Sequence, residues 1–241
     1  MELEASAGGA FRPAAAQETV PPVSTAEIAD ILTNTTPHHA VILSAIKRLT
    51  DIVGALVGLS VCSVVYLLCA RTIRRQSGAS VIFRQRRVGE GGRTFELFKL
   101  RTMRADAEKR LQKLQHRNEM RGPVFKIRND PRIIPIGRWL RRYHLDELPQ
   151  FWNVLTGEMS LVGARPPTPL EVERYSHRHY LRLRMKPGLT GLWQLYGNAA
   201  VNDFEEIVKL DCRYIDKWSL WLDFKILIKT VPAVIKTRGA Y

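Results

Sequence analysis

The stretch IVGALVGLSVCSVVYLLCA, residues 52–70, holds 19 consecutive residues without a charge. As an α-helix it would be roughly 28 Å long, about the thickness of the hydrocarbon core of a bilayer. Three interpretations stay open: a buried helix of a soluble domain, a helix that crosses a membrane, and a re-entrant helix. The stretch therefore decides the fold class, because it separates a membrane protein from a soluble one.

Basic residues flank this apolar run at both ends. Lys47 and Arg48 precede it, and Arg71, Arg74 and Arg75 follow it. Positive charges usually mark the cytoplasmic end of a crossing helix, so a symmetrical pattern assigns no orientation. The symmetry fits a re-entrant helix with both ends on the cytoplasmic face. It equally fits a crossing helix whose orientation is weakly specified.

The chain of 241 residues is strongly basic, with a net charge of +14. Residues 1–40 oppose this trend with five acids and one base, and their Ala, Pro and Thr content predicts a disordered tail. A large basic excess predicts a polyanionic partner: nucleic acid, anionic lipid or a phosphorylated substrate. No nucleic-acid-binding signature accompanies the charge, so no nucleic acid partner is expected. The three cysteines form no metal-binding pattern.

The remainder of the chain has the mixed pattern of an α+β domain. Two β-type runs, residues 80–89 and 93–103, are separated by glycines and predict a hairpin. Helices are expected at residues 104–118, 136–143, 147–156, 169–184, 203–217 and 219–236, the last kinked by Pro232. The last helix combines tryptophans with lysines among aliphatic residues, which fits either a membrane-interface helix or a core helix. We expect a tail at 1–40, a membrane-inserted helix within 41–76, and a cytosolic catalytic domain with interfacial helices at 77–241.

Two adjacent carboxylates, Asp146 and Glu147, open the stretch LDELPQFWNVL. Pro149 predicts that they sit at a helix N-terminus, because proline is tolerated there and not further along. Successive helical residues point about 100° apart, so the two acids can serve one site from two directions, one attacking and one holding a metal. A helix N-terminus also suits phosphate. The competing interpretation is ordinary capping, which stabilises a helix by about 0.3–1 kcal/mol.

Several basic elements suited to phosphate accompany the acid pair. Arg165 lies in the rigid segment MSLVGARPP (159–167), and a guanidinium fork matches a diphosphate. Lys99 and Arg101 alternate with apolar residues and are predicted to project from one face of a strand. The segment MKPGLTG (185–191) is another stiff loop with a base. Each element alone fits a solvated basic surface, but together they indicate a phosphate site.

An ordered set of motifs over about residues 45–241 resembles one family closely. The motifs are KRLTD, VIFRQRRVG, FKLRTMR, NDPRIIPIGRWLRR, LDELPQFWNVLTGEMSLVGARP, KPGLTGLWQ and WSLWLDFKILIKTVPAVIKTRGAY. They look like the bacterial sugar transferases, the monotopic polyprenyl-phosphate phosphoglycosyl transferases that start exopolysaccharide, capsule and O-antigen assembly. The resemblance implies a Mg²⁺-dependent enzyme that moves a sugar-1-phosphate from a UDP-sugar to undecaprenyl phosphate. It also implies contact with membrane lipids in the bacterial inner membrane, with the catalytic domain facing the cytoplasm.

The resemblance also implies roles for individual residues. Asp146 matches the nucleophile that forms an aspartyl-phosphosugar intermediate, and Glu147 matches the partner that binds Mg²⁺. Arg141 falls where a base engages lipid phosphate, and Arg165 where one engages the nucleotide. The expected substrate-binding set is Lys99, Arg101, Arg141, Arg165 and Asp211. The ending GAY favours UDP-glucose or UDP-galactose, and the sequence leaves the oligomeric state open, a homodimer included.

Three departures from the family pattern motivate an alternative. Val64 follows Ser63 where the family has a proline that bends the membrane helix. Ala164 stands in a GPRP-type motif and is expected to loosen that loop. His144 replaces a serine and is expected to cap the helix that follows, although it could instead tune the site near neutral pH. The alternative function is a catalytically inactive membrane or regulatory module of the same fold.

Overall fold

The structure is a computed structural model that describes residues 41–119, 122–125, 127, 129–196 and 203–236. The expected tail at 1–40 lies outside the described residues. The helices are α2 (Val41–Ser77), α3 (Ala107–Leu114), α4 (Pro135–Arg142), α5 (Gln150–Thr156), α6 (Pro169–Val172), α7 (Leu192–Tyr196), α8 (Phe204–Asp216) and α9 (Leu220–Lys236). The strands are β1 (Ile82–Val88), β2 (Thr94–Leu100), β3 (Ser160–Val162) and β4 (Gly188–Thr190). The mixed α+β fold class is confirmed.

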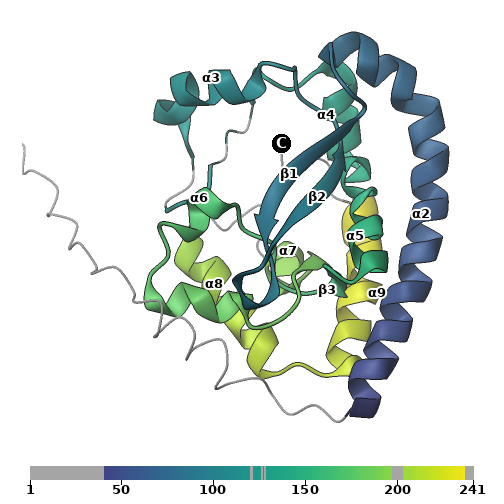
Figure 1. The fold of residues 1–241 in the computed structure, drawn as a ribbon, viewed down its shortest axis with the longest axis vertical. Coiled ribbons are helices and arrows are strands. Elements are labelled where there is room, and N and C mark those ends of the chain that lie inside the picture. The colour runs from purple at the N-terminus through teal and green to yellow at the C-terminus, as the bar shows by residue number, and fades with distance from the viewer. Residues whose placement is uncertain (1–40, 120–121, 126, 128, 197–202, 237–241) are drawn as a thin grey trace, which may run out of the picture.

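Helix α2 lies along one side of the molecule over nearly its full height (Figure 1). Among the described residues, it is the helix long and apolar enough to be a membrane segment. It continues through Ser63 and Val64, where Ser63 Oγ donates a hydrogen bond back to the Leu59 carbonyl at 2.9 Å. Sharp helix bends almost always need a proline or a comparable defect. Val64 therefore removes the cause of the re-entrant bend, and residues 41–77 form one unbroken helix.

The predicted hairpin is confirmed in β1 and β2. The strands pair antiparallel from Ile82 opposite Leu100 to Val88 opposite Thr94. Gly91 and Gly92 take positive φ values of 64° and 76° in the connecting turn, a conformation that glycine adopts without a steric penalty. The hairpin positions Lys99 next to the core because Leu97 and Leu100 are buried on either side of it.

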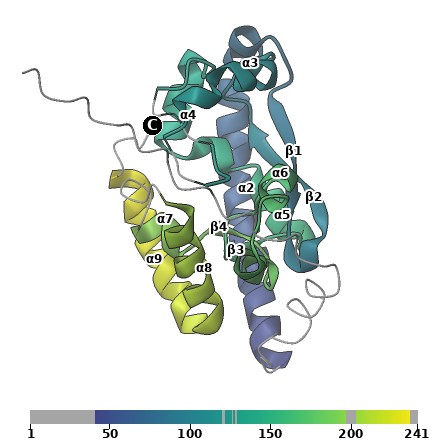
Figure 2. The same ribbon diagram turned by 90° about the vertical axis from the view of Figure 1, so that its left-hand side faces the viewer.

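The core lies between α2, α5 and the C-terminal helices, around the short strand β3. Strand β3 pairs in parallel with β4, Ser160 opposite Gly188 and Val162 opposite Thr190. The Tyr214 hydroxyl oxygen on α8 lies 3.1 Å from the Val162 carbonyl oxygen. Figure 2 shows α8 and α9 packed together on one side of β3 and β4, with the hairpin on the other. The core thus joins the C-terminal helices to the part of the chain that carries the acid pair.

Two of the expected helices differ from the structure. The helix expected at 169–184 is wrong, because the chain forms α6 (Pro169–Val172) and then a 3₁₀ segment, His177–Leu183. Thr168 and Ser176 each form a capping box, so two helix-start signals interrupt what looked like one periodic stretch. The helix expected at 147–156 begins instead at Gln150, and the acid pair occupies a 3₁₀ turn, Leu145–Glu147, before it.

Candidate functional site

The acid pair sits in a tight reversal between α4 and α5. His144 takes a left-handed conformation there, with φ 53° and ψ 20°, and it is the only non-glycine residue of the described chain with a positive φ. This conformation costs a non-glycine residue roughly 1–2 kcal/mol. The His144 side chain makes no capping hydrogen bond, so the expectation that it caps the helix is wrong. Its backbone instead closes the turn, because the Glu147 N–H donates to the His144 carbonyl at 3.2 Å.

Lys99 links the hairpin to the acid pair. Its Nζ donates a hydrogen bond to Glu147 Oε1 at 2.8 Å, and both side chains are largely buried. Asp146 is 7% exposed, and no described residue is shown donating a hydrogen bond to its carboxylate. The contact with Lys99 therefore distinguishes the two acids, since one is paired and the other is available to a substrate.

The same contact separates the pKa values of the two acids. Burial raises the pKa of Asp146, and the negative charge of Glu147 adds to the rise against the opposing charges of Lys99, Arg141 and His144. Burial would also raise the pKa of Glu147, but the charge and hydrogen bond of Lys99 lower it to about 2. Glu147 therefore stays ionised at any physiological pH, while Asp146 becomes the more basic carboxylate.

A cavity of about 40 Å³ lies next to Glu147 and carries a strong positive charge. Its basic lining comes from Lys99, Arg165 and Arg87, and His144 also borders it. Arg87 was not singled out from the sequence, because it stands within the run RQRR, where no single arginine is distinguished. Burial lowers the pKa of Arg87 to about 10, and the neighbouring charge of Arg165 contributes. Adjacent buried cations of this kind suit an anionic ligand.

The loop that presents Arg165 is held through its main-chain carbonyls. The carbonyls of residues 164–167 accept, in order, from Gly188 N (2.8 Å), Arg182 Nη2 (3.3 Å), Arg87 Nη1 (2.8 Å) and Val88 N (2.9 Å). The expectation that Ala164 loosens this loop stays a prediction, and these hydrogen bonds argue against it. Its backbone is fixed from both sides, by β4 and by the end of β1.

Asp211 lies behind this loop and does not line the cavity. It is 1% exposed and accepts a hydrogen bond from Arg182 Nε at 2.7 Å. Arg182 Nη1 donates to the Tyr175 hydroxyl at 2.6 Å, and Nη2 reaches the Arg165 carbonyl. Asp211 thus contacts the site through Arg182, a residue that the sequence did not distinguish from other surface bases.

Of the two remaining predicted substrate-binding arginines, the structure places Arg141 near the acid pair and Arg101 away from it. Arg141 Nε donates to Thr102 Oγ1 at 2.9 Å, and its charge acts on Asp146. Arg101 turns away from the acids: its Nε donates to the Ser80 carbonyl at 2.6 Å, and its guanidinium lies over the Phe83 ring. The predicted common face of Lys99 and Arg101 ends at Leu100, where β2 ends, so the structure does not bring Arg101 to the acid pair.

Two uncharged polar groups border the same cavity. Trp193 Nε1 and Gln194 Oε1 are buried and have no hydrogen-bond partner among the described residues. Gln194 Nε2 donates to the Leu189 carbonyl at 3.2 Å, which leaves the amide oxygen as the unused atom. An unpaired buried polar atom costs about 1–3 kcal/mol, so a donor and an acceptor beside a charged cavity favour a ligand with polar, uncharged parts.

The acids also suit a metal ion with few protein ligands. No group of three or more His, Cys, Asp or Glu side chains that could hold a metal occurs in the described part of the chain. Mg²⁺ usually keeps several waters and binds through one or two carboxylates together with substrate phosphates. Asp146 and Glu147 beside a phosphate-suited cavity fit that ligand set.

Comparison with known proteins identifies the class to which this fold and site belong. Residues 42–237 match the bacterial sugar transferase family, and the chain belongs to that family. The match covers the hairpin, the acid turn, the Arg165 loop, α7 and α8.

Individual relatives then give the resemblance more detail. The chain is 49% identical over 194 residues to the galactosyl transferase CpsE of Streptococcus agalactiae, which covers 80% of this chain and 43% of that protein. It is 39% identical over 199 residues to the exopolysaccharide production protein ExoY of Rhizobium meliloti, covering 81% and 88%. It is 39% identical over 200 residues to the undecaprenyl-phosphate galactose phosphotransferase of Salmonella typhimurium, covering 81% and 42%. The chain therefore spans less than half of the first and third relatives and most of ExoY.

Proposed function

We propose that this protein transfers a sugar-1-phosphate from a UDP-sugar to undecaprenyl phosphate, as the first membrane step of exopolysaccharide synthesis. The observation that carries the proposal is a pair of adjacent carboxylates, buried Asp146 and half-buried Glu147, of which Glu147 lines a cavity shared with Lys99, Arg87 and Arg165. The names of the relatives support the substrate class, because they include galactose and glucose phosphotransferases of undecaprenyl phosphate. UDP-galactose and UDP-glucose are the preferred donors to test.

The first half of the reaction uses Asp146 as the nucleophile. A carboxylate oxygen of Asp146 attacks the phosphorus that bears the sugar, and the bond from that phosphorus to the UMP oxygen breaks. The sugar phosphate is then held on Asp146, and UMP leaves. Carboxylates are weak nucleophiles, so the charge on the phosphate oxygens must be neutralised. Arg165 and Lys99 stand beside the cavity and supply that positive charge.

In the second half, the lipid accepts the sugar phosphate. A phosphate oxygen of undecaprenyl phosphate attacks the same phosphorus, and Asp146 leaves as a free carboxylate. Arg141, whose positive charge acts on Asp146, is the base assigned to the lipid phosphate. Glu147 would hold Mg²⁺ together with substrate phosphates, and the ion would supply positive charge to the phosphate oxygens. Glu147 is suited to this because its low pKa keeps it ionised.

The proposed location is the cytoplasmic membrane of a bacterium, with the site facing the cytoplasm. The long apolar helix α2 and the basic surplus of the chain support membrane attachment. The lipid substrate requires it, since the polyprenyl chain stays in the bilayer. A homodimer stays an untested expectation.

The decisive experiment is a panel of UDP-sugars incubated with undecaprenyl phosphate and Mg²⁺, scored by UMP release and by lipid-linked product. We expect product with one hexose donor, and we expect Asp146→Asn to abolish both readouts while membrane association is retained. Asp216→Asn, at an exposed position of α8, is the matched control and should keep full activity. Wild-type turnover in Asp146→Asn would remove the nucleophile assignment. No product with any donor would favour the inactive membrane module instead.

A further inference from the structure

Arg87 differs from the other buried arginines in the part of the chain that the structure describes. Arg132 forms an ion pair with Asp130. Arg182 forms one with Asp211, so each of these two charges is balanced inside the protein. Arg87 is 6% exposed, and no Asp or Glu among the described residues forms an ion pair with it. At Arg87 the fold therefore buries a positive charge and leaves its counter-charge to another molecule.

The hydrogen bonds of Arg87 leave part of its guanidinium unused. Nε and Nη2 donate to Gln85 Oε1 at 3.1 and 2.6 Å, and Nη1 donates to the Pro166 carbonyl at 2.8 Å. Both acceptors are neutral, and the charges of Glu171 and Glu147 act on Arg87 from beyond ion-pair distance. A guanidinium has five N–H groups, so one N–H remains on each terminal nitrogen. Two such groups suit the paired oxygens of a phosphate, and Arg87 lines the cavity.

The hairpin sets the order of the cations along the cavity. Arg87 of β1 is opposite Phe95 of β2, so it lies on the same face of the hairpin as Lys99. Lys99 stands four residues beyond Phe95, which is about 13 Å of strand. The charge of Arg165 lowers the pKa of both Glu147 and Arg87. Arg165 is therefore within reach of both ends of the cavity, and Arg87 marks the end away from Lys99.

The proposed reaction sends the departing group toward that end. Asp146 attacks the phosphorus that bears the sugar, and in an in-line displacement the departing oxygen lies on the opposite side of that phosphorus. The bond from phosphorus to the UMP oxygen breaks with its electron pair, so the UMP phosphate gains one negative charge. Positive groups aimed at the place where charge develops lower the barrier most. The acid turn stands with Lys99 at one end of the cavity, so the UMP phosphate is expected toward the other.

We infer that Arg87 binds the departing nucleotide and holds the UMP phosphate together with Arg165. The inference rests on the proposed function, because it takes the donor to be a UDP-sugar. The nucleotide supplies the counter-charge that no described residue gives to Arg87. Lys99, held by Glu147, stays with the phosphate that is transferred. The two phosphates of the donor are thus bound by different cations.

Titration of UMP into the purified full chain, followed by isothermal calorimetry, tests the assignment. Arg87→Gln should weaken UMP binding about 10- to 100-fold, because it removes charged hydrogen bonds to the phosphate. Arg86→Gln is the matched control, since Arg86 is exposed on the other face of the same strand and the change in net charge is identical. The control should bind UMP like the wild type. Equal weakening in both variants would reduce the effect to general electrostatic attraction and overturn the assignment.

A second variant changes the counter-charge and leaves Arg87 in place. Gln85→Glu puts a carboxylate where the amide oxygen already accepts from Arg87, with almost no change in shape. Arg87 then has a partner inside the protein, so UMP should bind less tightly while the unfolding temperature without ligand does not fall. This variant keeps the test decisive if Arg87→Gln does not fold. Unchanged UMP affinity in Gln85→Glu would contradict the inference.

A double-mutant cycle with Arg165→Gln separates direct contact from support of the Arg165 loop. If Arg87 contacts the phosphate itself, Arg87→Gln still lowers UMP affinity in the Arg165→Gln background. Loss of the effect in that background would mean that Arg87 only positions the loop, which would overturn the inference.

UMP binding is measured without lipid and without transfer, so it is independent of the nucleophile. If the wild type forms lipid-linked product and Arg87→Gln binds UMP normally, this inference fails and the proposed function stands. If the wild type neither binds UMP nor forms product, both fail.

Discussion

At the scale of single residues, the acid pair shows how one contact separates two chemically similar groups. Asp146 is buried and its neighbour Glu147 is half-buried, yet the Lys99 ammonium pairs with Glu147. The pKa of Glu147 falls to about 2 while that of Asp146 rises. The contact with Lys99 therefore explains how two adjacent acids in a strongly basic chain take different pKa values. Glu147 is a permanent anion beside the basic cavity, and Asp146 is a more basic carboxylate.

Replacement of Lys99 tests this division of roles. The charge of Lys99 lowers the pKa of both acids, so Lys99→Met should raise both values. If both acids must be ionised for transfer, activity disappears as the pH falls through those pKa values. The acidic limb of kcat/KM for UMP release should then move to higher pH in Lys99→Met and stay near that of the wild type in Lys99→Arg. If Lys99→Met lowered the maximal kcat/KM without shifting its acidic limb, Lys99 would serve only to bind substrate.

The sequence predicted some site residues and not others, for identifiable reasons. Asp146, Glu147 and Arg165 stand in short, stiff segments where residue type and spacing carry information. The structure brings Glu147 and Arg165 to one cavity with Lys99, and Asp146 adjoins Glu147 without lining that cavity. Arg87 and Arg182 stand among other bases, and only tertiary contacts distinguish them. Trp193 and Gln194 belong to the motif KPGLTGLWQ, but only the folded structure shows that their buried polar atoms lack hydrogen-bond partners.

At the scale of elements, the Arg165 loop depends on residues distant in sequence. Arg87 comes from β1 and Arg182 from the 3₁₀ segment, and both donate to loop carbonyls. Arg182 in turn is fixed by Asp211 of α8. The sequence predicted the hairpin and α8 well, but not the break in 169–184 that turns Arg182 inward. The short strand β3 was also missed, since three residues are too few to show a period.

Asp211→Asn should disturb this loop without touching the cavity. The change leaves Arg182 as a buried cation without its counter-charge, and breaking such a pair costs about 3–5 kcal/mol. We expect a lower unfolding temperature in detergent, together with a KM for the UDP-sugar that rises more than kcat falls. Glu206→Gln, an exposed change on the same helix, should leave both unchanged. An equal loss in kcat with an unaltered KM would contradict a positioning role for Asp211.

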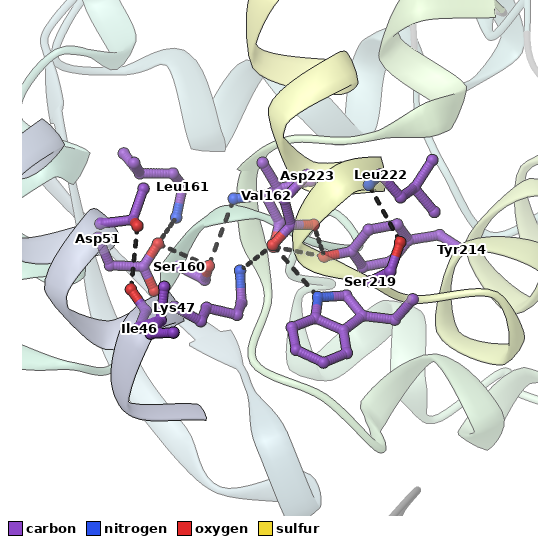
Figure 3. Close-up of polar contacts among 12 residues, drawn as sticks. Ile46, Lys47, Asp51, Ser160, Leu161, Val162, Tyr214, Ser219, Leu222 and Asp223 are labelled. Atoms are coloured by element: carbon purple, nitrogen blue, oxygen red, sulfur yellow. Dashed lines mark hydrogen bonds and ion pairs between the residues drawn. The ribbon is translucent and has the colours of Figure 1, made fainter. Parts of the chain in front are cut away.

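At the scale of the whole molecule, Asp223 joins three helices. It accepts hydrogen bonds from Lys47 Nζ of α2 and the Tyr214 hydroxyl of α8, both at 2.7 Å, and from Trp218 Nε1 at 3.2 Å. Figure 3 shows this group lying beside the contact of Asp51 with β3. Helix α2 and the C-terminal helices are thus fixed to each other by a polar cluster.

Asp223→Asn should therefore weaken the attachment of α2. The amide keeps an acceptor for Tyr214 or Trp218 but loses the charge that pairs with Lys47. Hydrogen bonds to charged groups contribute about 1.5–3 kcal/mol, and we expect the free energy of unfolding to fall by that amount. Thermal unfolding in lipid nanodiscs measures the effect, and limited proteolysis should cut first near residues 41–48. Unfolding at the wild-type temperature would show that the cluster adds nothing to stability.

The way the Arg165 loop is held has a consequence for how such proteins diverge. Every amino acid carries the same carbonyl group, so the four bonds at residues 164–167 tolerate exchange of the side chains beside Arg165. Insertion or deletion of one residue, by contrast, would shift all four carbonyls out of register together. The length of this loop should accordingly be conserved more strictly than the amino acids in it. A distant homologue is then better recognised by the number of residues around its arginine than by the identity of the residues beside that arginine.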